Sequence, residues 1–429
     1  MTTPRRTFLT RASTASAALA MTSAAQASAE SKSSSPMETI RLGLVGAGGR
    51  GGGAVINSLS VNENVILHTI ADVDGEKTSR LVSGLSRRFD DRIDVPESRQ
   101  HADLDGYQKI LNDPAVDIVL FATPPGFRPR HILEAVQAGK HVFAEKPVCV
   151  DPAGYHICLK ADQLAKDNQT SIVTGTQYRR QRNYVAAMSR IHAGDIGDIV
   201  SATSRYCSNG IWYRSRPEDM PDTQWQLRNW MHFIWLSGDQ ITEQAVHNID
   251  VMNWLMGGPP KTAFGSGGRF TRPDDSEMWD SMSIDYNYPG DRVISFKCRQ
   301  IPSATSEVQT VIAGTHGSAT IKGSNGGATI RDASGNQIWS MDGNIGAAYE
   351  QEHKDLVTAI RNGRPIVELK QTADSSLTAV MGRLAAYTGQ RVDWDFVSKS
   401  SKLDLFPKSL DLAEKRSSSF AIPGQTKLV

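Results

Sequence analysis

The chain has 429 residues, of which 39% are hydrophobic and 22% charged. This length and composition predict a folded protein of two or three domains and exclude a disordered or fibrous class. Lys and Arg number 47 against 46 Asp and Glu, a formal charge of +1, so we expect no nucleic-acid partner and no binding to anionic membranes. The 4 cysteines form no CxxC pair, which argues against a structural zinc site or a disulfide framework.

Residues 1–29 are predicted to be an export signal. Arg5 and Arg6 precede a short apolar pair, as in the twin-arginine motif, and an uncharged stretch rich in Ala, Ser and Thr follows. This stretch has too many hydroxyl groups for a membrane span. We therefore expect a periplasmic or otherwise exported protein, with a flexible linker over residues 30–39. Because twin-arginine substrates fold before export, a nicotinamide cofactor would have to travel bound.

A glycine-rich loop directly follows the first predicted strand, residues 40–45, and precedes a predicted helix. The second predicted strand, residues 65–71, ends in Asp72, which lies 21 residues after Gly51. A GxGxxG loop in this context is the fingerprint of a dinucleotide site, in which glycines allow close approach and a helix N-terminus faces the phosphates. We predict a Rossmann domain over residues 40–165, with these cofactor-binding residues: Gly46, Gly48, Gly49, Arg50, Gly51, Asp72, Thr123, Pro124, Glu145 and Lys146.

Asp72 also bears on which nicotinamide cofactor is bound. A carboxylate at this strand end suits the adenosine ribose hydroxyls and repels a 2′-phosphate, which favours NAD over NADP. Asp74 is the alternative ribose ligand if the strand runs two residues longer, and Arg50 near the loop leaves NADP open.

The pattern of predicted elements changes after residue 165. Before it, apolar strands alternate with helices, which predicts a parallel sheet covered on both faces. After it, strands at hairpin-like spacing predict an α+β domain over residues 166–395, with an open, mainly antiparallel sheet for substrate and oligomer contacts. Helices at 349–361 and 375–388 are expected to return to the first domain, and residues 396–429 form an extension. The predicted strands of this second part are residues 171–174, 200–206, 281–288, 292–297, 308–313 and 318–321.

Two segments carry groups suited to proton transfer. Lys146 follows the fifth predicted strand, where an ammonium can stabilise a developing alkoxide or relay a proton; alone, it would be read as a surface lysine. Glu243, His247 and Asp250 are spaced to share one face of a helix, so the histidine can act as a general acid/base oriented by a carboxylate. The alternative is a core histidine with surface acids. A metal site is disfavoured because no third ligand has motif spacing.

The glycine loop, the Glu145-Lys146-Pro147 motif and the acid-x-x-x-His-x-x-Asp segment, in this order, resemble the Gfo/Idh/MocA family of oxidoreductases. The resemblance covers about residues 40–395 and implies a Rossmann domain, an open-faced sheet domain, and sugars or polyols as substrates. It also implies that Lys146 and His247 are catalytic. The family usually has Asp where this chain has Glu243, so a catalytic role for Glu243 remains open.

An aromatic and basic stretch between these motifs is predicted to shape a sugar pocket, because sugars stack on flat rings and bond to polar groups. A core or interface role for its tryptophans is the alternative. The predicted substrate-binding residues are Tyr178, Arg179, Arg228, Trp230 and Asp250.

Three functions fit this reading. The first is an NAD(P)-dependent oxidoreductase acting on a sugar, glycoside or polyol, with tightly bound cofactor. The second is an NAD-dependent glycosidase or lyase that forms a transient ketone and eliminates the aglycone. The third is a non-catalytic sugar-binding protein, against which the presence of both Lys146 and His247 argues. In each case we expect a homo-oligomer, a dimer or tetramer.

Overall fold

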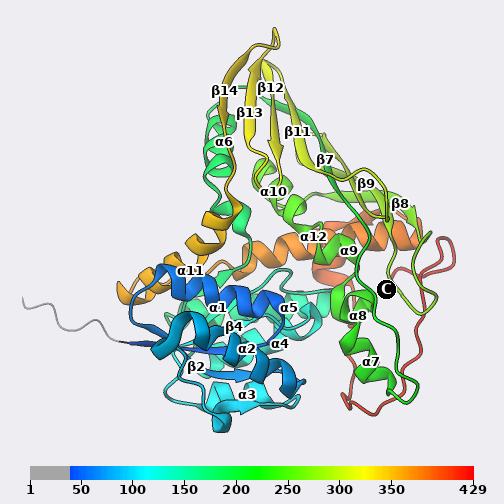
Figure 1. Ribbon diagram of the computed structural model, residues 1–429. Helices are drawn as coiled ribbons and strands as arrows, with labels where there is room; N and C mark the ends of the chain where they lie inside the picture. The colour runs from blue at the N-terminus through cyan, green and yellow to red at the C-terminus, as the bar shows by residue number, and fades with distance from the viewer. Residues whose placement is uncertain (1–38) are drawn as a thin grey trace, which may run out of the picture. The chain divides into compact units, whose positions relative to one another are not determined.

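The computed structural model describes residues 39–429, so the predicted export signal lies outside the described residues (Figure 1). Its N-terminal half contains a parallel sheet in the order β3-β2-β1-β4-β5-β6. This order, with helices between successive strands, is a Rossmann arrangement and confirms the predicted α/β class. The strands are β1 (Ile40–Val45), β2 (Val65–Ala71), β3 (Gln100–His101), β4 (Ile118–Phe121), β5 (His141–Ala144) and β6 (Ile172–Thr174).

Both faces of this sheet are buried, which explains why its strands are nearly continuous apolar runs. In β4, Ile118 and Leu120 belong to the core that includes Ala54 of α1, whereas Val119 and Phe121 belong to the core beneath α4. The helices of this half are α1 (Gly49–Val61), α2 (Gly75–Phe89), α3 (Gly106–Asn112), α4 (Arg128–Gln137) and α5 (Pro152–Asp167).

The structure corrects the sequence reading at β6. We predicted residues 171–174 as the first strand of the second domain, but β6 pairs in parallel with β5 and completes the first sheet. All three of its residues are buried, so an apolar segment this short carried no alternation from which its sheet could be inferred.

The second sheet has the order β14-β13-β12-β11-β7-β10-β9-β8-β15. Its pairings are antiparallel except that between β7 and β10, which confirms a mainly antiparallel sheet. Alternate residues of β9 are buried and the others are largely exposed, so one face of this strand is open. The strands are β7 (Ile199–Ser208), β8 (Thr262–Gly268), β9 (Ser281–Tyr288), β10 (Arg292–Gln300), β11 (Glu307–Gly314), β12 (Gly317–Lys322), β13 (Ala328–Asp332), β14 (Gln337–Met341) and β15 (Val392–Asp393).

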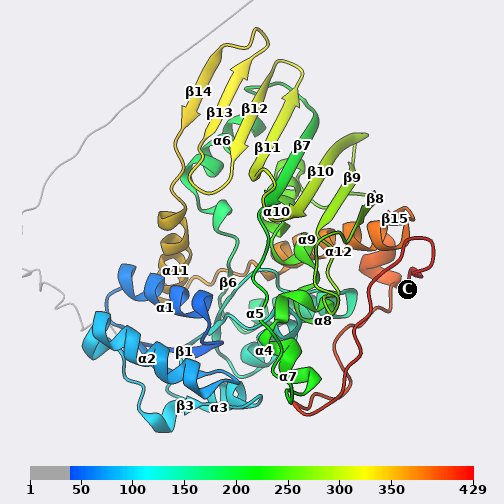
Figure 2. The same ribbon diagram turned by 45° about the vertical axis from the view of Figure 1, so that its right-hand side comes forward.

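Helices join the two halves of the described chain, and Figure 2 shows them between the second sheet and the Rossmann domain. Leu356 and Val357 of α11 pack in the core that includes α1, and Asp374 of α12 accepts a hydrogen bond of 2.9 Å from the Tyr155 hydroxyl of α5. The last long helices therefore return to the first domain, as predicted. None of the helices within residues 39–429 is long and apolar enough to cross a membrane. The helices of this half are α6 (Arg182–His192), α7 (Asp222–Arg228), α8 (Ile234–Ser237), α9 (Gln240–Glu243), α10 (Val246–Met256), α11 (Ile345–Arg361) and α12 (Leu369–Thr388).

Candidate active site

The glycine loop connects the end of β1 to the start of α1. A Cβ atom on Gly51 would lie 2.0 Å from the Gly46 carbonyl oxygen, so only glycine allows this close approach of helix and strand. Gly46 itself has φ of +99°, which favours glycine. In contrast, a Cβ on Gly48 or Gly49 would meet nothing within 4 Å. Open space above these two residues, at a helix N-terminus, fits a dinucleotide pyrophosphate.

Asp72 follows β2 directly and is tied to the loop. Its carboxylate accepts a 2.8 Å hydrogen bond from the Ala47 amide and a 3.0 Å bond from the Asp74 amide. Asp74 instead caps α2 by accepting from the Glu76 amide, so the strand does not extend to it. The Lys77 ammonium lies 3.8 Å from the Asp72 carboxylate.

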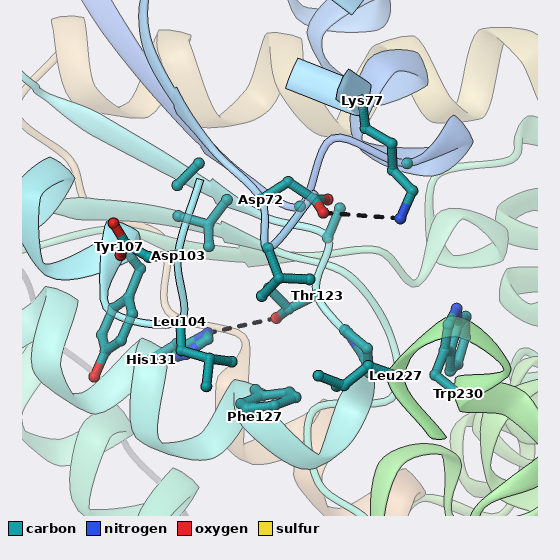
Figure 3. Close-up of a pocket in the computed structure, with 17 residues that line it drawn as sticks. Asp72, Lys77, Asp103, Leu104, Tyr107, Thr123, Phe127, His131, Leu227 and Trp230 are labelled. Atoms are coloured by element: carbon teal, nitrogen blue, oxygen red, sulfur yellow. Dashed lines mark hydrogen bonds and ion pairs between the residues drawn. The ribbon is translucent and has the colours of Figure 1, made fainter. Parts of the chain in front are cut away.

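A pocket of about 140 Å³ opens beside Asp72, at the carboxyl ends of β1, β2 and β4 (Figure 3). Thr123 and Pro124 line it, as predicted for this sheet edge. Its deeper wall is aromatic, with Phe127 and His131. Burial and the charges of Arg128 and Arg130 lower the pKa of His131 to about 3, so its ring is neutral.

Arg50 is not among the residues that line the pocket, and it forms an ion pair with the Glu145 carboxylate. Its guanidinium also lies 4.5 Å from the centre of the Tyr349 ring, a contact that the motifs did not signal. Burial alone would lower the pKa of Arg50, but Glu145 and Glu352 outweigh it and raise that pKa. Paired in this way, Arg50 is not directed toward a ribose 2′-phosphate beside Asp72.

Lys146 directly follows Glu145, and its side chain reaches the segment that contains Glu243. Its ammonium donates to the Glu243 carbonyl oxygen at 2.6 Å and to the carboxylate at 3.2 Å. Both side chains are largely buried, with exposed fractions of 12% and 8%. Glu243 therefore holds the Lys146 ammonium in place.

The prediction of one helix carrying Glu243, His247 and Asp250 is wrong, because α9 ends at Glu243 and α10 begins at Val246. The chain turns between them, where the Ala245 amide bonds to the Gln240 carbonyl oxygen five residues earlier. This turn separates Glu243 from the helix of His247 and brings it to Lys146.

The His247 ring contacts two tyrosines, with centroid distances of 5.5 Å to Tyr178 and 6.4 Å to Tyr206. Burial, with the positive charges of Lys146 and Arg50, lowers the pKa of His247 well below its usual value. No residue in the described range 39–429 hydrogen-bonds to this ring. His247 is thus a neutral imidazole with free nitrogen atoms, suited to accept a proton.

The comparisons with known proteins agree with this geometry. Residues 40–174 match the oxidoreductase family with an NAD-binding Rossmann fold of Gfo/Idh/MocA type, and residues 184–320 match the GFO/IDH/MocA C-terminal domain. The chain belongs to the Gfo/Idh/MocA oxidoreductase family. Its N-terminal domain is the family's NAD-binding domain, and the protein is an oxidoreductase.

Relatives in this family include sugar and polyol enzymes. The inositol 2-dehydrogenase of Acidothermus cellulolyticus is 22% identical over 76% of this chain and 86% of its own length. The scyllo-inositol 2-dehydrogenase (NAD(+)) of Bacillus subtilis is 25% identical over 50% of this chain and 57% of its own. A glycosyl hydrolase family 109 protein of Solibacter usitatus is 31% identical over 48% and 46%. Several curated relatives are thus matched over only about half of their length.

Solved structures of the same fold include levoglucosan dehydrogenase in complex with NADH and levoglucosan, with a TM-score of 0.67 and 18% identity. The match covers 83% of this chain and 99% of that one. The aldose-aldose oxidoreductase from Caulobacter crescentus has a TM-score of 0.65 at 17% identity, over 83% of this chain and 100% of its own. At this identity the likeness establishes the fold alone.

In this Gfo/Idh/MocA chain, two of the predicted substrate ligands bind each other. Arg179 donates to both carboxylate oxygens of Asp250, at 2.7 and 2.9 Å, and the Ser375 hydroxyl donates to Asp250 at 2.8 Å. Asp250 is 3% exposed. The pair therefore braces α10, which carries His247, and its charges largely compensate each other.

The other predicted sugar ligands lie in different surroundings. Tyr178 is buried, stacks on Tyr184 with ring centroids 4.4 Å apart, and adjoins His247. Arg228 is exposed at the end of α7. Trp230 lines the pocket beside Asp72, on the nucleotide side. Sequence reasoning did not identify Tyr206, which ends a predicted strand. Its hydroxyl donates to Gln244 at 3.0 Å, and its ring contacts His247.

Within the described residues, no group of three or more His, Cys, Asp or Glu side chains is placed to hold a metal ion. The contacts of Lys146 and His247 are suited to charge stabilisation and proton transfer.

Proposed function

We propose that this protein oxidises a hydroxyl group of a sugar or polyol, with NAD as the hydride acceptor and His247 as the base. The observation that carries the proposal is the unbonded, neutral His247 ring beside a Lys146 ammonium held by Glu243. Relatives named as inositol dehydrogenases support the substrate class.

When bound, NAD would supply the hydride-accepting carbon. His247 takes the hydroxyl proton as the carbon–oxygen double bond forms, and the C–H bond supplies the hydride. Lys146 stabilises the negative charge that develops on that oxygen before the carbonyl is complete. Tyr178 and Tyr206, whose rings contact His247, hold its ring in position.

The remaining predictions form part of this proposal. Asp72 and the pairing of Arg50 with Glu145 support NAD over NADP. The twin-arginine motif at Arg5 and Arg6 supports export to the periplasm, where the cofactor would remain bound and be reoxidised by a second substrate. The open face of β9 is available for contacts in a dimer or tetramer.

A second candidate is redox-neutral cleavage of a glycoside. The match to a glycosyl hydrolase family 109 protein favours it. In that reaction the ketone formed at one carbon acidifies the neighbouring C–H, so a base can drive elimination of the aglycone; water addition and re-reduction complete the cycle.

One experiment separates these functions. The purified protein is mixed with inositols, aldoses, anhydrosugars and aryl glycosides, and both NADH absorbance and aglycone release are recorded. Accumulation of NADH supports the dehydrogenase, and aglycone release without net NADH supports the glycosidase. Ligand binding without NADH formation, aglycone release or reduction of a second sugar would overturn the proposed function in favour of a sugar-binding protein.

A further inference from the structure

The pocket beside Asp72 has one wall that does not come from the Rossmann domain. Leu227 and Trp230 line it opposite Asp72, and Figure 3 shows both side chains directed toward it. They belong to residues 222–232, here called the cap, which comprises α7 and a short turn.

The cap is too short to be stable by itself, since a seven-residue helix does not persist alone in water. It is held by a separate hydrophobic cluster in which Leu227 and Trp230 pack near Trp235 and Phe406. Phe406 makes edge contacts with Phe127 and Trp235, at centroid distances of 5.5 and 6.0 Å. Since Phe127 also lines the pocket, this cluster joins the cap to the wall of the pocket that contains Phe127.

Phe406 belongs to residues 403–416, here called the strap, which follows α12 and β15 near the end of the chain. At one end, the Leu405 amide donates to Asp151 at 2.8 Å and the Ala153 amide donates to the Leu403 carbonyl at 3.2 Å. These contacts fix the strap to the start of α5 in the Rossmann domain. Arg130 of α4 lies 3.8 Å from the centre of the Phe406 ring.

The other end of the strap is bonded to the cap. The Arg416 amide donates to Asp222 at 2.8 Å, and its guanidinium donates to the Thr223 hydroxyl at 2.8 Å. The Thr223 hydroxyl donates in turn to the Glu414 carbonyl at 3.2 Å. In Figure 2 the red C-terminal chain runs beside α7. The strap thus ties the cap to the domain whose pocket it borders.

The pocket has the chemistry of an adenosine site. Asp72 offers a carboxylate for ribose hydroxyls, and Phe127, Trp230 and the neutral His131 offer ring surfaces on which a purine can stack. We propose that Trp230 and Leu227 form an outer wall for the adenosine half of the cofactor, and that the strap keeps this wall closed. The strap and cap thereby make the bound nucleotide slow to leave.

The strap lies outside the segments of this chain that the family models match. The solved neighbours are matched over 98–100% of their length but cover only 83% of this chain. The strap lies beyond residue 320, where the family match ends.

The inference rests on the proposed function only in requiring a bound NAD(H). The test loads the full chain with NADH and measures loss of its fluorescence after addition of excess NAD. Trp230→Ala and Arg416→Ala are compared with Trp339→Ala and Arg331→Ala on β14 and β13. We expect NADH release at least tenfold faster in the first two variants, wild-type release in the controls, and partial recovery with Trp230→Phe.

Circular dichroism and Tm establish that each variant is folded. If Arg416→Ala fails to fold, Phe406→Leu tests the same strap. Folded strap variants that release NADH at the wild-type rate would overturn the inference while leaving the oxidoreductase function intact. A wild-type chain that contains no NAD(H) as purified and takes up no NADH on prolonged incubation would instead overturn the proposed function and the inference together.

Discussion

The cofactor loop and the catalytic group lie in one chain but are built in different ways. In the loop, the glycines that the backbone conformation and close packing require lie within six residues. Asp72, the proposed ribose ligand, directly follows the next strand. The proposed catalytic group combines Lys146, which follows β5, with Glu243 and His247 from α9 and α10 of another segment. Local spacing determines the geometry of the first group, whereas tertiary packing determines that of the second. The following predictions test this contrast.

The largest effect is expected from His247→Ala. Loss of a general base typically costs about 10²–10⁴-fold in turnover, and bound NAD(H) should stay at the wild-type level because the loop is untouched. Steady-state kinetics and cofactor content are the measurements. His316→Ala, an exposed histidine after β11, is the matched control. Full turnover in His247→Ala would remove the acid/base assignment.

Gly51→Ala should destabilise the fold, since its Cβ would lie 2.0 Å from the Gly46 oxygen. Overpacking of this kind costs about 1–3 kcal/mol, so the Tm should fall by several degrees. Gly49→Ala, whose Cβ meets nothing within 4 Å, should keep the Tm but weaken NAD binding. Equal Tm values for both variants would contradict the assigned roles of the two glycines.

Asp72→Ala should weaken NAD binding by roughly 10–100-fold, because hydrogen bonds to a charged group are worth about 1.5–3 kcal/mol. The same change should narrow the preference for NAD over NADP. Titration calorimetry with both cofactors measures these effects. Asp74→Ala, which removes a helix cap and an ion pair with Lys77, is the control; a larger loss there would transfer the ribose contact to Asp74.

The smallest expected effect is on the pH dependence of stability, and it concerns Glu277, which lies next to the cap. Burial raises the pKa of Glu277 to about 7, although its carboxylate accepts a hydrogen bond from the Ile234 amide. Because the folded-state pKa exceeds the unfolded one, protonation favours folding below about pH 4.5, and this stability is lost as pH rises through 7. Between pH 5 and pH 8, the free energy of unfolding should therefore fall more in wild type than in Glu277→Gln, by on the order of 1 kcal/mol.

Urea unfolding at pH 5 and pH 8 measures this difference. The exposed Glu218→Gln should keep the wild-type pH dependence. An unchanged pH dependence in Glu277→Gln would show that this carboxyl does not couple to folding.

The sequence predicted most of the first domain because glycine spacing and apolar strands are local signals. It also identified Lys146 and His247 as candidate catalytic residues, but it did not predict which side chains surround them. The break between α9 and α10 depends on a turn that helical spacing does not reveal. Trp230 was expected among the sugar ligands and lines the nucleotide pocket, and Arg179 and Asp250 neutralise each other. The last two outcomes depend on partners distant in sequence, which periodicity does not identify.

The position of the strap near the end of the chain has a consequence for the order of assembly. The residues that hold the cap are synthesised after the Rossmann domain, so the Rossmann pocket can form before its outer wall is secured. A nucleotide that arrives during this interval meets an open pocket, and docking of residues 403–416 then completes the enclosure. Cofactor loading becomes a step of maturation, and apoprotein that has already closed should take up NAD slowly.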